Sequence, residues 1–259
     1  MSPRADVLGC TIDRLDMAAT VAAVEQAIAT RTFTQHMAIN AAKLVTMHND
    51  EKLREIIGGC ELVNADGQAV VWASRLLGDP LPERVAGIDL MDELLAVAER
   101  RGYRVYFLGA RAEVLERALE RLRERYPALQ IAGARDGYFG DDEEAAVCDA
   151  IRATEPDMLF VAMSSPRKEY FLGSYGQAIG APFVMGVGGS IDVVAGITRR
   201  APERWQRLGL EWAYRLLQEP RRMFKRYAVT NTRFAALVAR ELLTGRRGHR
   251  PQIPQESAT

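Results

Sequence analysis

The sequence has few cysteines and no long apolar run, and both shortages limit what the protein can be. Cys10, Cys60 and Cys148 are odd in number, widely separated and without metal-ligand spacing, so we expect reduced thiols in a cytoplasmic protein. No long apolar run follows the first charged residue, which predicts no signal peptide. No stretch reaches the roughly 20 apolar residues of a membrane-spanning helix. Any contact with a membrane is therefore expected from outside the bilayer core.

Signature motifs of several protein classes are also missing. There is no HExxH, CxxC or GxSxG pattern, which removes the main support for a metalloprotease, a zinc module or an α/β-hydrolase. The absence of GxGxxG disfavours a nucleotide-dependent dehydrogenase. His36, His48 and His249 are isolated, and no DxD-like pair clearly follows a predicted strand. Asp141-Asp142 is better explained as a helix start. We therefore expect no metal site.

Charge of one sign does not dominate, but it is unevenly distributed. The chain has 34 basic and 34 acidic residues among 259. From residue 199 onward there are 14 Lys and Arg against 5 Asp and Glu, which leaves 20 basic and 29 acidic residues before that point. An acidic body with a basic end indicates an anionic surface as partner.

What is present is an alternation of short β-type runs with helical patterns, which predicts an α/β fold around a mainly parallel sheet. The predicted strands are residues 7–12, 34–39, 61–64, 104–108, 130–134, 158–162 and 183–187. The predicted helices between them include residues 17–29, 41–57, 68–77, 90–100, 112–125 and 143–153.

From residue 201 the strand signals stop, and helices are predicted at 202–218 and 220–243. Basic residues follow one stripe of the second helix, and Trp205 and Trp212 lie before it; this mixture is typical of a membrane interface rather than of nucleic-acid binding. We expect a core at 1–198, a basic amphipathic helical appendage at 199–243 and a disordered tail at 244–259. The residues expected to face the membrane or a lipid diphosphate are Arg215, Arg222, Lys225, Arg226 and Arg233.

In such sheets, ligands bind beyond the carboxyl ends of the strands, so the residues there are candidates. Asn40 is placed either to cap the next helix or to hold an anion or a sugar hydroxyl. Asp66, before Gly67, is placed either as a general base or as a cap in an Asx turn. Arg84 lies in a loop, where it is either a phosphate or carboxylate ligand or an ordinary surface arginine.

The remaining candidates suit a nucleotide. Gly109 follows a strand and either admits a diphosphate to the backbone or simply allows a turn. Arg167 and Lys168 either face a diphosphate or begin a solvated helix with an ordinary ion pair. Gly186, Gly188 and Gly189 predict a surface without side chains that suits a base or a phosphate. The carboxylate of Asp192 could accept a hydrogen bond from a ribose hydroxyl or a base N–H.

With these residues in view, the sequence resembles the WecG/TagA/CpsF family of bacterial glycosyltransferases, from about Leu8 to Phe234. The motifs that carry the resemblance are Ile39-Asn40-Ala41-Ala42-Lys43, Asn64-Ala65-Asp66-Gly67, Glu83-Arg84-Val85-Ala86-Gly87, Phe107-Leu108-Gly109, Gly186-Val187-Gly188-Gly189-Ser190-Ile191-Asp192, Arg200-Ala201-Pro202, Gly209-Leu210-Glu211-Trp212 and Arg215-Leu216-Leu217-Gln218-Glu219-Pro220-Arg221-Arg222.

The resemblance implies a Rossmann-like core of the GT-E type and sugar transfer from a UDP-sugar to a polyprenyl-diphosphate-linked saccharide, in cell-surface polysaccharide or wall-polymer biosynthesis. It implies that the C-terminal appendage binds the inner face of the cytoplasmic membrane and closes the active site. Asp66 matches the proposed catalytic base, Arg84 an essential arginine and Asn40 a pocket residue. The glycine loop, residues 186–192, matches the nucleotide-binding region of the family. The resemblance extends the role of nucleotide binding to Tyr138 and Gly109.

One departure concerns the donor. Many family members read Pro-Lys-Gln-Glu where this chain has Pro166-Arg167-Lys168-Glu169. An ammonium group donates but does not accept hydrogen bonds, so an acetamido contact of the sugar is altered. N-acetylmannosamine, a hexose and a uronic acid therefore all remain as donors.

The reaction expected is an inverting single displacement without a metal or other cofactor. The alternative from another class is an inactive nucleotide-binding or scaffold protein of the same fold. The sequence leaves a homo-oligomer open.

Overall fold

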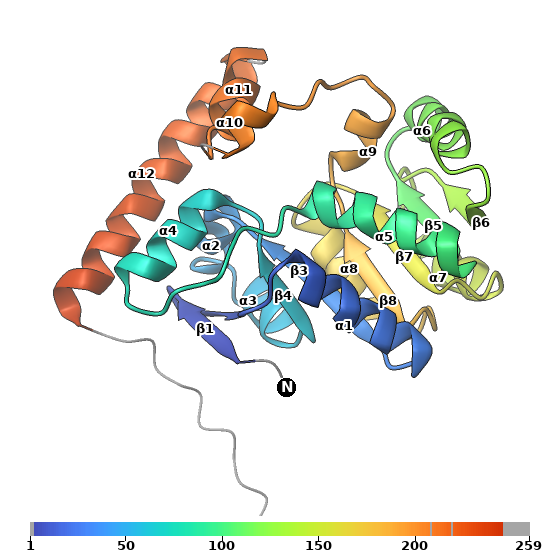
Figure 1. Cartoon of the computed structure of the whole chain (residues 1–259), viewed down its shortest axis with the longest axis horizontal. Helices are drawn as coiled ribbons and strands as arrows, with labels where there is room; N and C mark the ends of the chain where they lie inside the picture. The colour runs from blue at the N-terminus through green and yellow to red at the C-terminus, as the bar shows by residue number, and fades with distance from the viewer. Residues whose placement is uncertain (1–2, 208, 219, 246–259) are drawn as a thin grey trace, which may run out of the picture.

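The computed structural model describes residues 3–207, 209–218 and 220–245, without the side chains of residues 203, 207, 215, 221–223 and 225–227. The described chain is built around a six-stranded sheet of order β4-β3-β8-β7-β5-β6, in which all neighbours run parallel (Figure 1). The prediction of an α/β fold with a mainly parallel sheet is confirmed, and the architecture is consistent with a Rossmann-like core. The strands are β3 (Thr34–Ile39), β4 (Leu62–Ala65), β5 (Arg104–Gly109), β6 (Gln130–Arg135), β7 (Met158–Ala162) and β8 (Phe183–Gly186).

Helices cover both faces of the sheet, because its central strands are apolar on both sides. On β8, Phe183 and Met185 pack in one buried cluster, whereas Val184 between them packs in another. The helices that contribute to the first cluster are α1 (Met17–Ala29), α5 (Gly87–Arg101), α6 (Ala112–Arg125) and α9 (Ser190–Val194). The second contains residues of α7 (Glu144–Arg152) and α8 (Arg167–Tyr175); the 3-10 helix η1 (Asp141–Glu143) leads into α7, as Asp141-Asp142 predicts.

The predicted strand at residues 7–12 is wrong. The chain instead forms an antiparallel hairpin of β1 (Arg4–Val7) and β2 (Cys10–Asp13). Leu8 and Gly9 make the turn with φ angles of 57° and 78°, and the Gly9 N–H donates to Asp6 at 3.0 Å. This left-handed conformation suits glycine, and an Asp side chain can satisfy the turn locally.

The predicted helix at residues 41–57 is two helices, α2 (Ala41–Met47) and α3 (Glu51–Gly58). Asp50 divides them, because its Oδ1 accepts the Leu53 N–H at 2.9 Å and caps α3. An Asp side chain that satisfies a free N–H at a helix start favours a new helix over continuation of the previous one. Next along the chain is α4 (Gln68–Leu76).

Three helices end the described chain: α10 (Glu203–Arg207), α11 (Glu211–Gln218) and α12 (Pro220–Thr244). The long helix α12 lies against α2, where Phe234 and Val238 join a buried cluster that includes Leu44 (Figure 1). The single helix predicted at 202–218 is divided at Gly209, whose φ is +67°. A Cβ on Gly209 would lie 2.6 Å from the Cβ of Gln68, so this turn lies directly against the start of α4. Residues 246–259 of the predicted tail lie outside the described residues.

Candidate functional site

The carboxyl ends of the parallel strands lie at one edge of the sheet, and two predicted site residues are neighbours there. Asn40 follows β3 and Asp66 follows β4, and the last residues of these strands, Ile39 and Ala65, pair in register. A Cβ on Gly67 would lie 3.6 Å from the Cβ of Asn40. Asn40 and Asp66, which are 26 positions apart in the sequence, are therefore brought together at the edge of the sheet where ligands bind in such folds.

Asp66 is held by backbone groups on both sides. Its N–H donates to the carbonyl of Ile39 at 2.7 Å, and its Oδ1 accepts the N–H of Gly87, the first residue of α5, at 2.8 Å. The side chain is partly exposed. Burial raises the pKa of Asp66, while the Gly87 hydrogen bond and the charges of Lys43 and Arg84 oppose the rise. A fixed, partly accessible carboxylate of raised pKa has the properties of a general base.

Asn40 caps α2 in this structure. Its Oδ1 accepts the backbone N–H of Lys43 at 3.0 Å, and its backbone is extended. The capping alternative thus accounts for the side-chain oxygen. Contact of Asn40 with a sugar stays a prediction.

A compact charged cluster lies beneath this edge. Lys43 Nζ and Lys168 Nζ lie 2.9 Å and 2.8 Å from the same Oε1 of Glu169, and all three residues are buried. Although burial opposes it, the two ammonium groups lower the pKa of Glu169 to about 2. Gly186 makes room for Lys168, since a Cβ there would lie 2.9 Å from the Lys168 Cδ. The cluster and Gly186 line a cavity of about 10 Å³, enough for about one water molecule.

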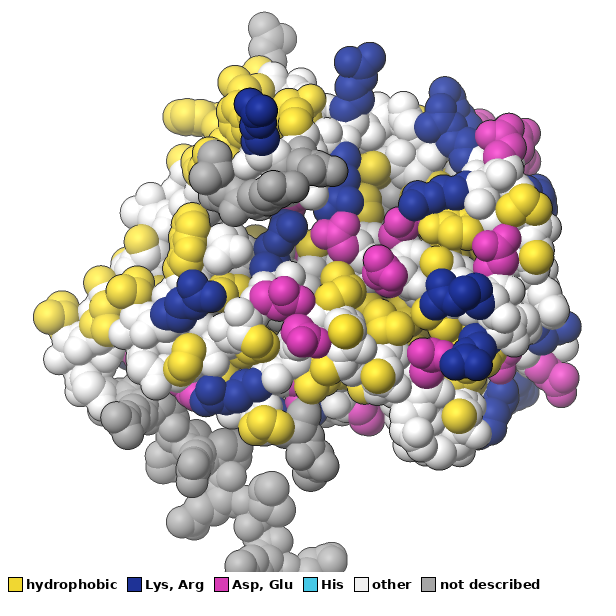
Figure 2. All heavy atoms as spheres, in the orientation of Figure 1, with side chains coloured by type: hydrophobic (Ala, Val, Ile, Leu, Met, Phe, Trp, Pro, Cys, Tyr) yellow, Lys and Arg dark blue, Asp and Glu magenta, His cyan; other side chains and the backbone are white. Residues whose placement is uncertain are grey.

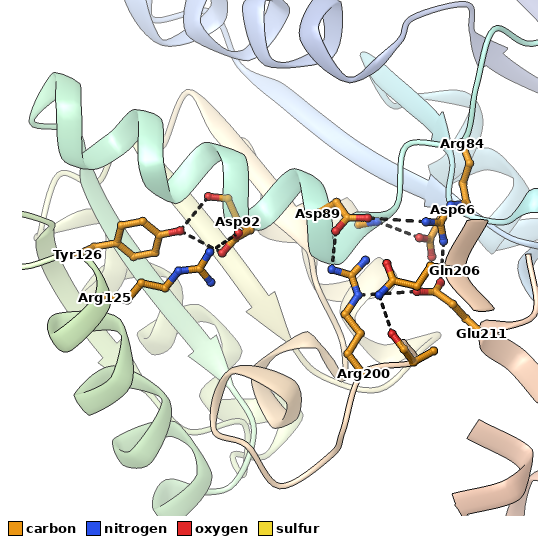
Figure 3. Close-up of polar contacts among 11 residues, drawn as sticks. Asp66, Arg84, Asp89, Asp92, Arg125, Tyr126, Arg200, Gln206 and Glu211 are labelled. Atoms are coloured by element: carbon orange, nitrogen blue, oxygen red, sulfur yellow. Dashed lines mark hydrogen bonds and ion pairs between the residues drawn. The ribbon is translucent and has the colours of Figure 1, made fainter. Parts of the chain in front are cut away.

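Arg84 belongs to a closed set of charges beside Asp66, the ion-pair ring (Figure 3). Its Nη1 lies 2.6 Å from Oε2 of Glu211, and its Nη2 lies 3.8 Å from Oδ2 of Asp89. Arg200 closes the ring, with Nη1 2.6 Å from Asp89 Oδ1 and Nε 3.7 Å from Glu211 Oε1. The ring joins the loop before α5, the first turn of α5, the segment after α9 and α11.

The residues predicted near the nucleotide lie at the same edge, and some have clear structural contacts. Arg167 Nη1 donates to the carbonyl of Gly137 at 3.2 Å and its Nη2 donates to that of Phe139, so Arg167 holds the loop that carries Tyr138. The Tyr138 side chain is 75% exposed. At Gly109, φ is +121° and a Cβ would lie 2.5 Å from the Ala162 carbonyl carbon, so only glycine fits between these strands.

The glycine loop follows β8 and leads into α9. Gly188 has φ +52°, and its N–H donates to the carbonyl of Val161 at 3.3 Å. A Cβ on Gly189 would meet only Oδ2 of Asp192, at 3.6 Å. The Asp192 carbonyl accepts two N–H groups, at 2.9 Å and 3.1 Å, that close the end of α9. This side-chain-free turn leaves space beside β8, and its nucleotide role stays a prediction.

The C-terminal helices expose apolar side chains. Figure 2 shows hydrophobic groups at the surface of these helices. Trp212, Leu217 and Phe224 are exposed large hydrophobic side chains of α11 and α12. Arg233 is exposed on α12, whereas the side chains of Arg215, Arg222, Lys225 and Arg226 lie outside the described residues. Of the described helices, none is long and apolar enough to cross a membrane. Nor does any group of three or more His, Cys, Asp or Glu in the described chain suit a metal ion.

The decisive comparison is with protein families. The model of the glycosyl transferase WecG/TagA/CpsF family matches residues 5–248, nearly the whole chain. The chain belongs to this family.

The chain is also similar to the N-acetylglucosaminyldiphosphoundecaprenol N-acetyl-beta-D-mannosaminyltransferase of Bacillus spizizenii. It is 41% identical over 167 residues, which is 64% of this chain and 64% of the relative. The alignment therefore spans less than two thirds of that glycosyltransferase.

Proposed function

We propose that the protein transfers a sugar from a UDP-sugar to a hydroxyl group of a polyprenyl-diphosphate-linked saccharide, in the assembly of a cell-surface polymer. The acceptor oxygen forms a bond to the anomeric carbon of the donor. The bond from that carbon to the β-phosphate oxygen breaks, and UDP leaves with the bonding electrons. Asp66 takes the proton of the acceptor hydroxyl. A single displacement of this kind inverts the anomeric configuration.

The observation that carries the proposal is the anchored carboxylate of Asp66 beside Arg84 at the carboxyl edge of the sheet. The Gly87 N–H fixes one carboxylate oxygen at 2.8 Å, so a backbone group orients the carboxylate. Burial raises its pKa toward the range in which a base both is ionised and accepts a proton well. A bare binding protein has no need of a partly buried carboxylate held in this way.

Arg84 is the cation best placed to offset charge on the departing UDP. Its guanidinium is largely buried and close to Asp66, and a guanidinium presents paired donors that match phosphate oxygens. Arg167 instead donates two hydrogen bonds to the backbone carbonyls of Gly137 and Phe139, and Lys168 is paired with Glu169. We therefore assign Arg84 to the leaving group and Arg167 to the nucleotide loop. In this assignment the reaction requires no metal.

The donor sugar depends on the surroundings of Lys168. The name of the Bacillus spizizenii relative specifies an N-acetylmannosaminyl group and a diphospho-undecaprenol acceptor. Lys168 is buried near Asp66, and burial lowers the pKa of its ammonium group. The ammonium group of a buried lysine beside the base donates hydrogen bonds but accepts none. It therefore suits a sugar that presents hydrogen-bond acceptors, such as hydroxyl groups or a carboxylate. N-acetylmannosamine, a hexose and a uronic acid are the donors to compare.

The acceptor lipid places the reaction at a membrane surface, which we propose is the inner face of the cytoplasmic membrane. The C-terminal helices expose apolar side chains near the site, and exposed Arg233 adds positive charge. Apolar groups beside basic groups are typical of interfacial helices. In this arrangement α10–α12 lie between the lipid surface and the catalytic edge.

The experiment is a UDP-release assay on the full chain, with a panel of UDP-sugars and a short-chain polyprenyl-diphosphate saccharide. We expect one donor to release UDP only when the acceptor is present, and the product lipid to gain one sugar by mass. UDP binding without release by any donor would instead favour a nucleotide-binding scaffold. Release that needs no lipid-linked acceptor would contradict the acceptor class.

A further inference from the structure

The ion-pair ring beside Asp66 is neutral as it stands. Two guanidinium groups, from Arg84 and Arg200, are balanced by the carboxylates of Asp89 and Glu211 (Figure 3). The two carboxylates differ in origin. Asp89 lies in the first turn of α5, next to the site, whereas Glu211 is supplied by α11, which lies 127 positions from Arg84 in the sequence.

Arg200 does not use all of its donors within the ring. Its Nη1 pairs closely with Asp89 at 2.6 Å, but its Nε is 3.7 Å from Glu211, beyond hydrogen-bonding distance. Nε and Nη2 are both buried and donate no hydrogen bond to the described part of the chain. A buried guanidinium donor without an acceptor costs free energy, so its retention calls for a partner in a functional state.

We infer that Arg200 binds the diphosphate of the donor together with Arg84, and that this diphosphate takes the place of Glu211. The inference rests on the proposed function, since it takes the donor to be a nucleoside diphosphate sugar. A guanidinium fork matches adjacent phosphate oxygens, and two such forks side by side match a diphosphate. Glu211 is the carboxylate that exchanges, because it is presented by the separate helix α11, whereas Asp89 lies in α5 and keeps its close pair of 2.6 Å with Arg200.

The location fits the chemistry. The charges of Arg84 and of Glu211 both act on the pKa of Asp66, so the ring and the base share one site. In a single displacement the anomeric carbon lies between the acceptor oxygen, next to the base, and the departing diphosphate. The base and the cations of the leaving group therefore flank the same sugar carbon, and the arginine pair is close enough to Asp66 for this arrangement.

The proposed exchange predicts the direction in which diphosphate affinity changes when Glu211 is neutralised. In the free protein Glu211 competes with the incoming diphosphate for Arg84 and Arg200, so neutralising Glu211 strengthens diphosphate binding. If the ring served only to fasten α11 to the core, the same change would leave binding unaltered or weaken it.

The test is calorimetric titration of the full chain with UDP, inorganic pyrophosphate and uridine. We expect Arg200→Gln to weaken UDP and pyrophosphate binding by roughly tenfold to a hundredfold, the span of a charged hydrogen-bonding partner, while uridine binding stays unchanged. Arg200→Lys, which keeps the charge but not the fork, should fall between. Arg199→Gln, an exposed neighbour in the same segment, is the matched control and should bind as the unmodified chain does.

Because each variant is compared through its ratio of UDP to uridine affinity, loss of folding is separated from loss of the diphosphate contact. Glu211→Gln should raise UDP affinity. Unchanged UDP affinity in Arg200→Gln, or weaker UDP binding in a folded Glu211→Gln protein, would overturn the inference. UDP binding that depends on Arg200 in a protein that transfers no sugar would refute the proposed function and leave this inference standing.

Discussion

The carboxylate Oδ1 of Asp66 accepts the backbone N–H of Gly87 at 2.8 Å, and this contact joins the end of β4 to the start of α5. A backbone donor at a helix N-terminus is fixed in place and carries part of the helix dipole, which favours an ionised carboxylate. Burial acts in the opposite direction and dominates, so the pKa of Asp66 is raised. The carboxylate that we propose as the base is therefore oriented, and its pKa shifted, by the junction of two elements.

The pH dependence of turnover follows from that raised pKa. A base must be ionised, so kcat/KM should fall as the pH drops through a midpoint above the ordinary value of 3.8. Lys43→Met removes a charge that lowers the pKa of Asp66, and should move the midpoint to higher pH. Lys52→Met, an exposed lysine on α3, is the control. A midpoint that stays fixed or moves down in Lys43→Met would argue against Asp66 as the titrating group.

A methyl group in the glycine loop should separate binding from folding. At Gly189 a Cβ meets only Asp192, at an ordinary contact distance of 3.6 Å, so Gly189→Ala should keep the melting temperature. The methyl group would occupy the surface assigned to UDP, and we expect UDP affinity to fall by about tenfold, as for a poorly fitting group in a packed site. Calorimetry that finds unchanged affinity would place the nucleotide elsewhere.

Buried His36 should make stability depend on pH. Burial lowers its pKa to about 4, from 6.5 in the unfolded chain. The unfolded state therefore binds a proton at higher pH than the folded state does. The contribution of neutral His36 to the free energy of unfolding is fully present above pH 6.5. It is lost as the pH falls toward 4, which lowers that free energy by on the order of 3 kcal/mol.

The measurement is urea unfolding at several pH values in His36→Gln and in the exposed control His48→Gln. Gln can still donate to Oδ1 of Asn64, which His36 Nε2 contacts at 3.1 Å. The stability loss between pH 6.5 and 4 should be smaller in His36→Gln than in His48→Gln. Equal losses would show that His36 titrates normally.

Charge on α12 should govern binding to lipid. Arg233 and Arg240 are exposed, whereas the neighbouring Phe234 and Val238 are buried against the core, so truncation of the helix would damage the fold. Arg233→Glu with Arg240→Glu leaves the buried face intact. It should weaken co-sedimentation with anionic liposomes by about tenfold or more, because each basic charge near the surface contributes about 1 kcal/mol.

The binding of the unmodified chain should weaken as salt rises. The control is Arg117→Glu with Arg123→Glu, a pair of exposed arginines on α6. Equal binding by the two double variants would remove α12 from the lipid contact.

The sheet could be predicted from sequence because each strand is a short apolar run between helical patterns. The predicted and observed bounds agree at both ends for Thr34–Ile39 and Met158–Ala162, and differ by one residue or less at each end of the other strands of the sheet. The exceptions are set by single residues. Gly9 reverses the chain, Asp50 starts a new helix, and Gly209 divides the helix predicted at 202–218. An apolar period alone does not reveal these local conformations.

The site was predictable only in part. The positions of Asp66 and Arg84 at one edge of the sheet could be predicted because each lies next to a regular element, whereas their roles stay predictions. Asp89, Arg200 and Glu211, which form the ion-pair ring with Arg84, were not among the predicted site residues, although the last two lie in the motifs that carry the family resemblance. Charged residues that meet across more than a hundred positions have no local pattern, and only the folded chain brings them together. The pairing of Lys43 and Lys168 with one carboxylate was hidden for the same reason.

The most direct measurement is the turnover of Asp66→Asn with the donor and acceptor that the UDP-release assay identifies. Asn keeps an oxygen that can accept the Gly87 N–H but takes no proton, so turnover should fall by roughly two to four orders of magnitude. The change also removes a carboxylate whose burial is unfavourable, so the melting temperature should stay level or rise. Because it removes a negative charge near Arg84, UDP affinity should not fall. Asp149→Asn, an exposed carboxylate on α7, should leave turnover unaffected. Near-normal turnover in a folded Asp66→Asn protein would contradict the assignment of Asp66 as the base.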